Sequence, residues 1–390
     1  MHATNIFRKL AIVALFAALF RLGFIYLLKE SINPNEFTAY IFLTSILAAC
    51  SALISPIDVI NSRFIKDSRF DDLYGYSLFH VTLRVSIILV ASIILISFVS
   101  IPKEIADLVY IAIILGLTGS VLANFVYISN IAIGKNSIKV NIIFLLPISI
   151  KFFLLILCIV QGFSFVEIVF VCEIMQFIVC VLIVFFRLRE VHTHIKKYRY
   201  VFLENISLLT KQIKIYGYQG FMMIPVSYIK TNIAPLFASS SLSADSTFYI
   251  LVTQRLFDQI RTILSKPNML LSGYSGSRVD ISYVWLIPLF ICIVASIYGY
   301  LNLASIALLY FLVRLIDFFI FLSCYRVFGN YLKLQSFHGY NKFIFFPELV
   351  FLSCFIFFDK TLTTFIGLLL FRSVLGFISW FIFSKKALIN

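Results

Sequence analysis

Charged residues are scarce in this sequence. They make up 13% of its 390 residues, whereas hydrophobic residues make up 61%. A water-soluble domain of this length cannot hide so much apolar surface, because a large part of any globular protein stays in contact with water. The scarcity of charge therefore excludes an ordinary soluble domain and predicts a membrane protein. Among the charged residues, acidic ones are scarcer than basic ones, 18 against 32. The positions of this excess of basic residues along the chain can therefore indicate how the chain is oriented in the membrane.

Several chemical motifs are also missing. The seven cysteines lie mostly in apolar runs and form neither a CxxC motif nor a Cys/His cluster, which argues against a metal site or a disulfide framework. No G-x-x-x-x-G-K-[ST] phosphate loop, G-x-S-x-G elbow or H-E-x-x-H pair is present. We therefore expect no enzymatic activity, no cofactor and no nucleic-acid partner. If the protein is a transporter, its energy has to come from an ion gradient or from its substrate.

Long apolar runs divide the chain into roughly twelve predicted membrane-spanning helices, since about 20 apolar residues cross the hydrocarbon core. The run at 281–313 is too long for one helix, and residues 299–302 supply a turn within it. The sequence thus predicts an all-α, polytopic membrane protein. The predicted spans are 10–28, 37–57, 78–101, 108–133, 140–161, 165–186, 215–237, 246–265, 281–300, 303–325, 343–358 and 361–384.

The positions of lysine and arginine agree with these spans. When the N-terminus is placed in the cytoplasm, the cytoplasmic segments hold 22 of these residues, and the opposite loops hold only Lys29, Lys103 and Lys360. Cytoplasmic loops of membrane proteins retain positive charge in this way, so we expect both termini in the cytoplasm. The basic stretch 187–214 separates two sets of six helices. The predicted organisation is a six-helix bundle at 1–190, a basic linker at 191–214 and a second six-helix bundle at 215–390.

The two halves share an internal repeat at an offset of 209 residues. Its pattern, acid-x-Thr-x-Tyr-Ile-x-x-Thr, begins at Glu36 in one half and at Asp245 in the other. One basic residue, Arg21 or Lys230, lies deep in the predicted helix before each copy. Because each half contains an even number of spans, the copies have the same orientation, which predicts a pseudo-twofold axis along the membrane normal.

Twelve ionisable residues fall within the predicted spans or, in the case of Asp58, directly beyond the end of one. Each costs about 2.5–3.5 kcal/mol at the centre of a spanning helix, so we expect them to face protein or a polar cavity. They are Arg21, Arg84, Lys151, Lys230, Arg255, Arg314, Arg372, Asp58, Glu173, Asp258, Asp317 and Glu348. Four of them are secondary candidates for the functional site: Arg84, Lys151, Arg314 and Arg372. Glu348 and Arg372 either pair between the last two helices or extend toward the membrane interface.

Some of these charges have partners nearby in the sequence. Arg255 and Asp258 are three residues apart and share a helix face, and so do Arg314 and Asp317. Such pairs either neutralise themselves for insertion or contribute to a functional cavity. Asp58, Asp258 and Asp317 are the candidates for binding a coupling proton or sodium ion.

Arg21 and Lys230 have no acidic residue within a turn or two in the sequence. Across the predicted axis they would face one another, and with Arg255 they would form a cationic patch between the halves. Guanidinium and ammonium groups bind phosphate oxygens well in a low-dielectric cavity, so the patch predicts a substrate with a phosphate or pyrophosphate group. The alternative is structural pairing with Asp58 or Asp258 across helices.

Two six-helix halves joined by a basic cytoplasmic linker resemble the polysaccharide-specific transporters of the multidrug/oligosaccharidyl-lipid/polysaccharide exporter superfamily, and among them the O-antigen flippases. The segments 34–40 (PNEFTAY) and 242–249 (LSADSTFY) are similar to that family's short external turns, and Ser265-Lys266-Pro267 is similar to a proline-containing helix end. The resemblance implies a V-shaped pair of bundles around a central cationic cavity. It places Arg21, Asp58, Lys230 and Arg255 in that cavity.

The same resemblance implies a flippase of the bacterial inner membrane. Its substrate would be an undecaprenyl-pyrophosphate-linked oligosaccharide, moved between leaflets by alternating access, and its partners would include membrane lipid and other surface-polysaccharide assembly proteins. An integral-membrane polymerase or glycosyltransferase of the same pathway is an alternative, but such enzymes usually carry a large external loop, and here no external loop exceeds roughly ten residues. A related exporter of cationic drugs is a second alternative. It would need an acidic cavity, whereas the twelve ionisable residues comprise seven bases and five acids.

Overall fold

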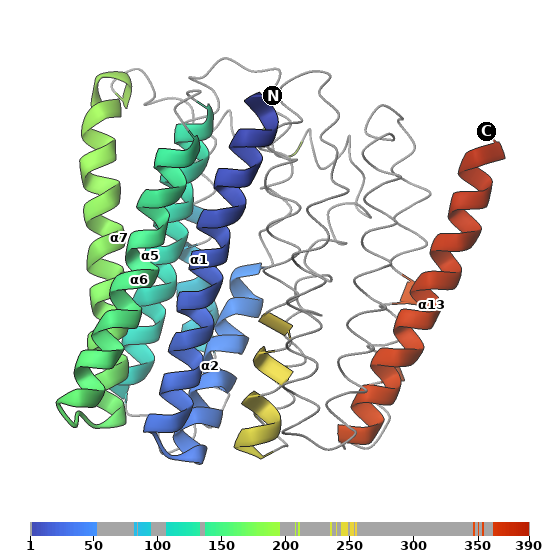
Figure 1. The fold of residues 1–390 in the computed structure, drawn as a ribbon, viewed down its shortest axis with the longest axis horizontal. Coiled ribbons are helices and arrows are strands. Elements are labelled where there is room, and N and C mark those ends of the chain that lie inside the picture. Colours follow the sequence, from blue (N-terminus) through green and yellow to red (C-terminus); the bar gives the residue numbers. More distant parts are fainter. Residues whose placement is uncertain are drawn as a thin grey trace. The chain divides into compact units, whose positions relative to one another are not determined.

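The computed structural model describes six stretches of the chain and several short pieces (Figure 1). These residues are helical or lie in the turns between helices, and none of them is in a strand. The predicted all-α class is therefore confirmed for this part of the chain, while the number of helices and their topology stay predictions. The described residues are 2–52, 82–83, 85–94, 107–132, 137–195 and 362–389, with pieces at 207, 210, 235, 239, 243–248, 250–252, 254–255, 346–347, 350 and 353–354.

The chain divides into two compact units, one comprising Met1–Leu209 and Gln259–Asp280, the other Thr210–Asp258 and Ile281–Asn390. The long helices coincide with predicted apolar spans. In the first unit they are α1 (His2–Ser31), α2 (Pro34–Ala52), α5 (Asp107–Ala132), α6 (Ser137–Val160) and α7 (Phe165–Ile195), together with the helical segment Val85–Ile94. In the second unit the long helix is α13 (Leu362–Ile389).

The helices of the first unit pack around a shared interior. Helix α7 lies along both α5 and α6, α6 also packs on α1, and α2 contacts α5 and α1 (Figure 1). Leu28, Phe37, Ile113 and Leu155, from four different helices, are completely or almost completely buried. Side chains from neighbouring helices therefore meet at the centre of this unit.

A tight turn joins α6 to α7 and fixes their relative register. Gly162 adopts a φ of 71°, a left-handed conformation that costs glycine little. Next to it, the Phe163 N–H donates a hydrogen bond back to the Cys158 carbonyl at 3.0 Å, as in a Schellman motif. Ser164 then precedes α7 with one half of a capping box, because Glu167 Oε2 accepts from the Ser164 N–H at 2.8 Å. The Ser164 hydroxyl donates to the same oxygen at 2.7 Å. The two helices consequently form an antiparallel hairpin.

Both copies of the predicted repeat stand at a helix start. In the first unit, the Asn33 N–H donates to Glu36 Oε2 at 3.0 Å, which caps α2. In the second unit, the Ser243 carbonyl accepts from the Thr247 N–H at 2.9 Å, and its hydroxyl oxygen accepts from the Ser246 N–H at 3.4 Å. Residues 244–248 are helical. The pattern therefore marks a helix N-terminus in both places, as the sequence predicts.

The described helices carry long apolar stretches. Within this part of the chain, one helical stretch, Phe165–Phe186, is long and apolar enough to cross a membrane. Shorter apolar helical stretches lie at Val85–Ile94, Asp107–Leu122, Leu145–Val160 and Ile366–Gly376. Length and composition alone are therefore compatible with one membrane-spanning helix in the described residues.

Candidate functional site

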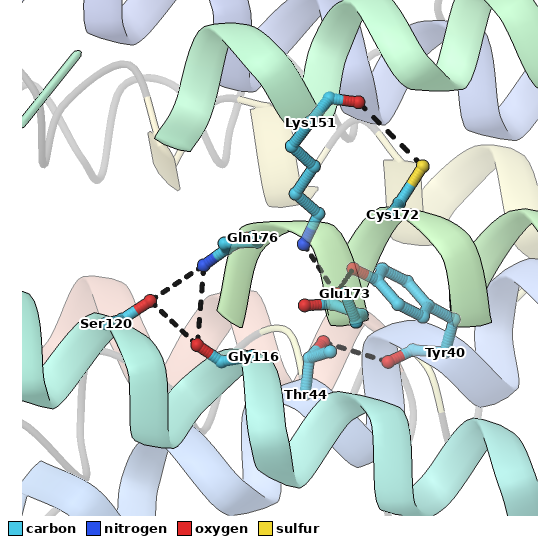
Figure 2. A network of polar contacts seen from close by, with 8 residues as sticks. All are labelled: Tyr40, Thr44, Gly116, Ser120, Lys151, Cys172, Glu173 and Gln176. Carbon is cyan, nitrogen blue, oxygen red and sulfur yellow. Dashed lines mark hydrogen bonds and ion pairs between the residues drawn. The ribbon is translucent and has the colours of Figure 1, made fainter. Parts of the chain in front are cut away.

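A carboxylate lies in the interior of the first unit. Glu173, the ninth residue of α7, has a side chain that is only 6% exposed. Its Oε1 atom accepts a hydrogen bond from the Tyr40 hydroxyl of α2 at 2.9 Å and one from Lys151 Nζ of α6 at 2.5 Å (Figure 2). A buried carboxylate is costly unless it is paired and hydrogen-bonded. Tyr40 and Lys151 meet both requirements from two other helices.

Lys151 is held by contacts on several sides. Its ammonium lies 4.9 Å from the centre of the Phe24 ring on α1, a cation–π contact. Its backbone carbonyl accepts a weak hydrogen bond from Cys172 Sγ at 3.8 Å (Figure 2). The ion pair therefore connects α6 and α7, and the ring of Phe24 brings α1 into contact with it.

The register of the α6–α7 hairpin explains why Lys151 and Glu173 meet. Lys151 lies eleven residues before Gly162, and Glu173 lies eleven residues after it. At 1.5 Å per residue, both are about 16 Å from the turn along antiparallel helices. The turn at Gly162 therefore places the two charges at the same depth.

Helix α5 makes room for the carboxylate at Gly116. A Cβ atom at this position would collide with Glu173 Oε2, so glycine lets the backbone of α5 approach the carboxylate. One turn along, the amide of Gln176 donates to Ser120 Oγ at 2.7 Å, and the Ser120 hydroxyl donates to the Gly116 carbonyl at 3.0 Å (Figure 2). Gln176 also donates to the Gly116 carbonyl at 3.4 Å. Polar groups of α5 and α7 thus continue the network.

We call these residues the Glu173 cluster: Tyr40, Gly116, Ser120, Lys151, Glu173 and Gln176. Four helices contribute to it, and its one ammonium and one carboxylate balance each other. Such a pair can bind an anion at the ammonium or a proton at the carboxylate. Among the residues that the structure describes, no group of three or more His, Cys, Asp or Glu side chains could hold a metal ion.

The sequence identified Lys151 and Glu173 as intramembrane charges but did not pair them, and it assigned no role to Tyr40 or Gln176. The signal for the ion pair was present, because the ends of the two predicted spans, 140–161 and 165–186, already define a short hairpin. Equal distances from Gly162 place the lysine opposite the glutamate. The contribution of α5 has no comparable sequence signal.

Arg21 lies on α1 and is exposed. It stands three residues before Phe24 and seven before Leu28, so all three share one face of the helix at about 100° per residue. The exposed apolar side chains of α1 lie on the opposite face; they are Ile12, Phe16, Leu19 and Tyr26. Arg21 therefore lies on the side of α1 that carries Phe24, the ring beneath Lys151.

The remaining predicted site residues lie in the second unit or outside the described residues. Arg255 is helical and half-buried, and Arg372 on α13 is buried; both belong to the second unit. The predicted meeting of Arg21, Lys230 and Arg255 therefore stays a prediction. Those outside the described residues are Arg84, Lys230, Arg314, Asp58, Asp258 and Asp317, together with Glu348.

No family model matches this chain, and neither a curated protein nor a solved structure matches it. The resemblance to polysaccharide exporters therefore rests on the sequence features described above.

Proposed function

We propose that this protein is a polytopic transporter of the bacterial inner membrane that moves a polyprenyl-pyrophosphate-linked oligosaccharide, such as an O-antigen repeat unit, from the cytoplasmic to the outer leaflet. The proposal joins three lines of support: the distribution of polar and apolar side chains on the helices, the placement of the basic residues, and the resemblance to O-antigen flippases. The first of these carries most weight.

Three helices of the first unit carry a stripe of exposed apolar side chains, and one ionisable residue lies on the opposite side of each. On α7, Ile178, Val181, Leu182 and Phe185 are exposed along one stripe, Phe185 by 64%. At about 100° per residue, Glu173 lies on the opposite side of this helix. In water this arrangement would be unfavourable, since it exposes an apolar surface and buries charges. In lipid both features are favourable.

Helices α6 and α1 repeat the arrangement. On α6 the exposed stripe contains Leu146, Phe153 and Leu157, and Lys151 points to the other side. On α1 the stripe lies opposite Arg21. Three helices with polar residues on their inner side and apolar residues outside support a bundle that is surrounded by lipid and has a polar interior.

A polar interior with basic residues suits an anionic cargo. Arg21, one of the two described members of the predicted cationic patch, lies on the inner side of α1. Arginine binds phosphate oxygens through several N–H donors at once. Together with the resemblance to O-antigen flippases, this position supports a pyrophosphate-linked substrate.

The test is removal of the two repeat-related cations. We expect the double variant Arg21→Ala/Lys230→Ala to lose surface glycan while its abundance in the membrane equals that of the wild type. The measurement compares glycan export in cells that depend on this protein with immunoblots of isolated membranes. Lys29→Ala is the matched control, because Lys29 is a basic residue near the end of α1 that pairs with Glu30 at 3.2 Å. Full export by the double variant would refute the role of the two cations.

A further inference from the structure

Lys151 is the more exposed of the two charged members of the Glu173 cluster. Its side chain is 16% exposed, whereas that of Glu173 is 6% exposed. An ammonium group has three N–H donors, and in the cluster one of them serves Glu173 Oε1. A four-carbon stem with several rotatable bonds lets the ammonium move without displacement of α6.

A second cation, Arg21, lies on the inner side of the neighbouring helix α1. Arg21 is one turn from Phe24, and the Phe24 ring lies 4.9 Å from Lys151 Nζ. Arg21 and Lys151 therefore lie on the inner sides of α1 and α6, two helices that pack on each other. Cations on two neighbouring helices suit a ligand with more than one negative charge, such as pyrophosphate.

We propose that Lys151 and Arg21 form a binding site for phosphate oxygens, in which Lys151 exchanges its partner Glu173 for the phosphate while Glu173 takes up a proton from hydronium or a buffer acid. The inference rests on the proposed function, because it names groups that hold the pyrophosphate of a lipid-linked cargo. In the absence of the anion, the Glu173 carboxylate forms an ion pair with the Lys151 ammonium and holds it in position.

Charge balance explains the proton. Without the anion, one ammonium and one carboxylate cancel. When a phosphate oxygen binds the ammonium, an ionised Glu173 would be left as an unpaired negative charge in a buried site, which is costly. When Glu173 takes a proton from hydronium or from a buffer acid, the bond between the proton and that donor breaks, an O–H bond forms on the carboxylate, and the negative charge of Glu173 is removed. Binding of the anion and of one proton are therefore coupled.

Polar and ionisable groups surround Glu173. Among the described residues, α2 contributes the Tyr40 phenol, α6 contributes the Lys151 ammonium, and α5 contributes Gly116, whose carbonyl accepts from the Ser120 hydroxyl. On α7 itself, the Cys172 thiol faces the Lys151 carbonyl. On α1, Arg21 keeps its charge at all accessible pH values.

The experiment measures anion binding by the purified full-length protein in lipid nanodiscs. The probes are inorganic pyrophosphate and farnesyl pyrophosphate, titrated calorimetrically at several pH values in two buffers with different ionisation enthalpies. We expect uptake of about one proton per bound anion and tighter binding as the pH falls. The prenyl probe should bind more tightly than inorganic pyrophosphate, and equal affinities would overturn the assignment to a lipid headgroup.

Three variants separate exchange from a purely structural role. Glu173→Gln keeps an oxygen for Tyr40 but removes the competing charge, so we expect about tenfold tighter binding at pH 8 and no proton uptake. Lys151→Gln should bind about tenfold more weakly. Glu167→Gln is the matched control, because Glu167 is an exposed carboxylate on the same helix, and it should bind like the wild type. Weaker or unchanged binding by Glu173→Gln, or proton uptake that persists in it, would overturn the exchange.

Further outcomes separate the anion site from the flippase function and cover a variant that does not fold. If Glu173→Gln does not fold, the proton count of the wild type decides, and a count of zero overturns the proposal. If the wild type binds anions with proton uptake but the Arg21→Ala/Lys230→Ala double variant exports glycan fully, the anion site stands and the flippase function fails. If the double variant loses export but the wild type binds anions without proton uptake, the flippase function stands and the exchange at Glu173 fails.

Discussion

Two glutamates on helix α7 show how the position of a residue along a helix determines its role. Glu167 stands in the first turn, is exposed, and accepts hydrogen bonds from the backbone and hydroxyl of Ser164. Glu173 lies six residues further on, is buried, and accepts from the side chains of Tyr40 and Lys151 on two other helices. The first carboxylate satisfies one backbone N–H group at the start of its own helix, whereas the second joins separate helices.

The two kinds of contact differ in what they need. The Glu167 contact needs only a spacing of three residues, so it forms with the helix itself. The Glu173 contact needs the hairpin at Gly162, the approach of α5 and the hydroxyl of Tyr40, so it forms only when the unit is assembled. Variants at Glu167 and Glu173 should therefore lower the free energy of unfolding by different amounts. They should also differ in how much of that loss a second substitution, at the partner residue, restores.

The largest effect is expected for Glu173→Ala. The variant leaves the half-buried Lys151 ammonium without its carboxylate, and breaking a buried ion pair from one side costs up to about 3–5 kcal/mol. The measurement is the free energy of unfolding of the purified protein, from SDS-induced or thermal unfolding. A double variant, Lys151→Met/Glu173→Met, should recover most of the loss because no charge is left alone. If the double variant is as unstable as the single one, the two residues do not act as a pair.

Much of the helical framework of the first unit could be predicted, because apolar runs of the right length mark its helices. The predicted span 165–186 lies within α7, and 140–161 coincides with α6 to within a few residues. The helices nevertheless extend beyond the apolar runs, as α7 does to Ile195 and α1 does at its start, His2. Apolar content marks where lipid is expected, while backbone hydrogen bonds continue into polar sequence, so the two boundaries differ.

The candidate site could be predicted only in part. A spacing of three residues, as between Arg255 and Asp258, indicates a partner on the same helix and carries no information about a partner across a turn. Lys151 and Glu173 were identified one by one for that reason. The approach of Gly116 to Glu173 depends on how α5 is rotated about its axis, and no sequence spacing reports that rotation.

A middle-sized effect is expected for Gly116→Ala. The added Cβ would collide with Glu173 Oε2, so α5 has to move or the carboxylate has to leave its partners, at a cost of about 1–3 kcal/mol. The measurement is again the free energy of unfolding. Gly367→Ala on α13 is the matched control, because nothing lies within 4 Å of the atom that it adds, and alanine is the better helix former. Equal stability of the two variants would show that the carboxylate is not held against α5.

The smallest effect is expected for Glu167→Gln, which completes the comparison with Glu173. Glutamine keeps an oxygen that can accept from the Ser164 N–H, and capping boxes use glutamine as well as glutamate. The change removes only the negative charge that favours a helix N-terminus, an effect that solvent and salt screen at an exposed position. Unfolding should therefore shift less than in Gly116→Ala, and the difference from the wild type should shrink further in high salt. A loss as large as that of Glu173→Ala would mean that the turn at Gly162, rather than the buried ion pair, is what holds α6 and α7 together.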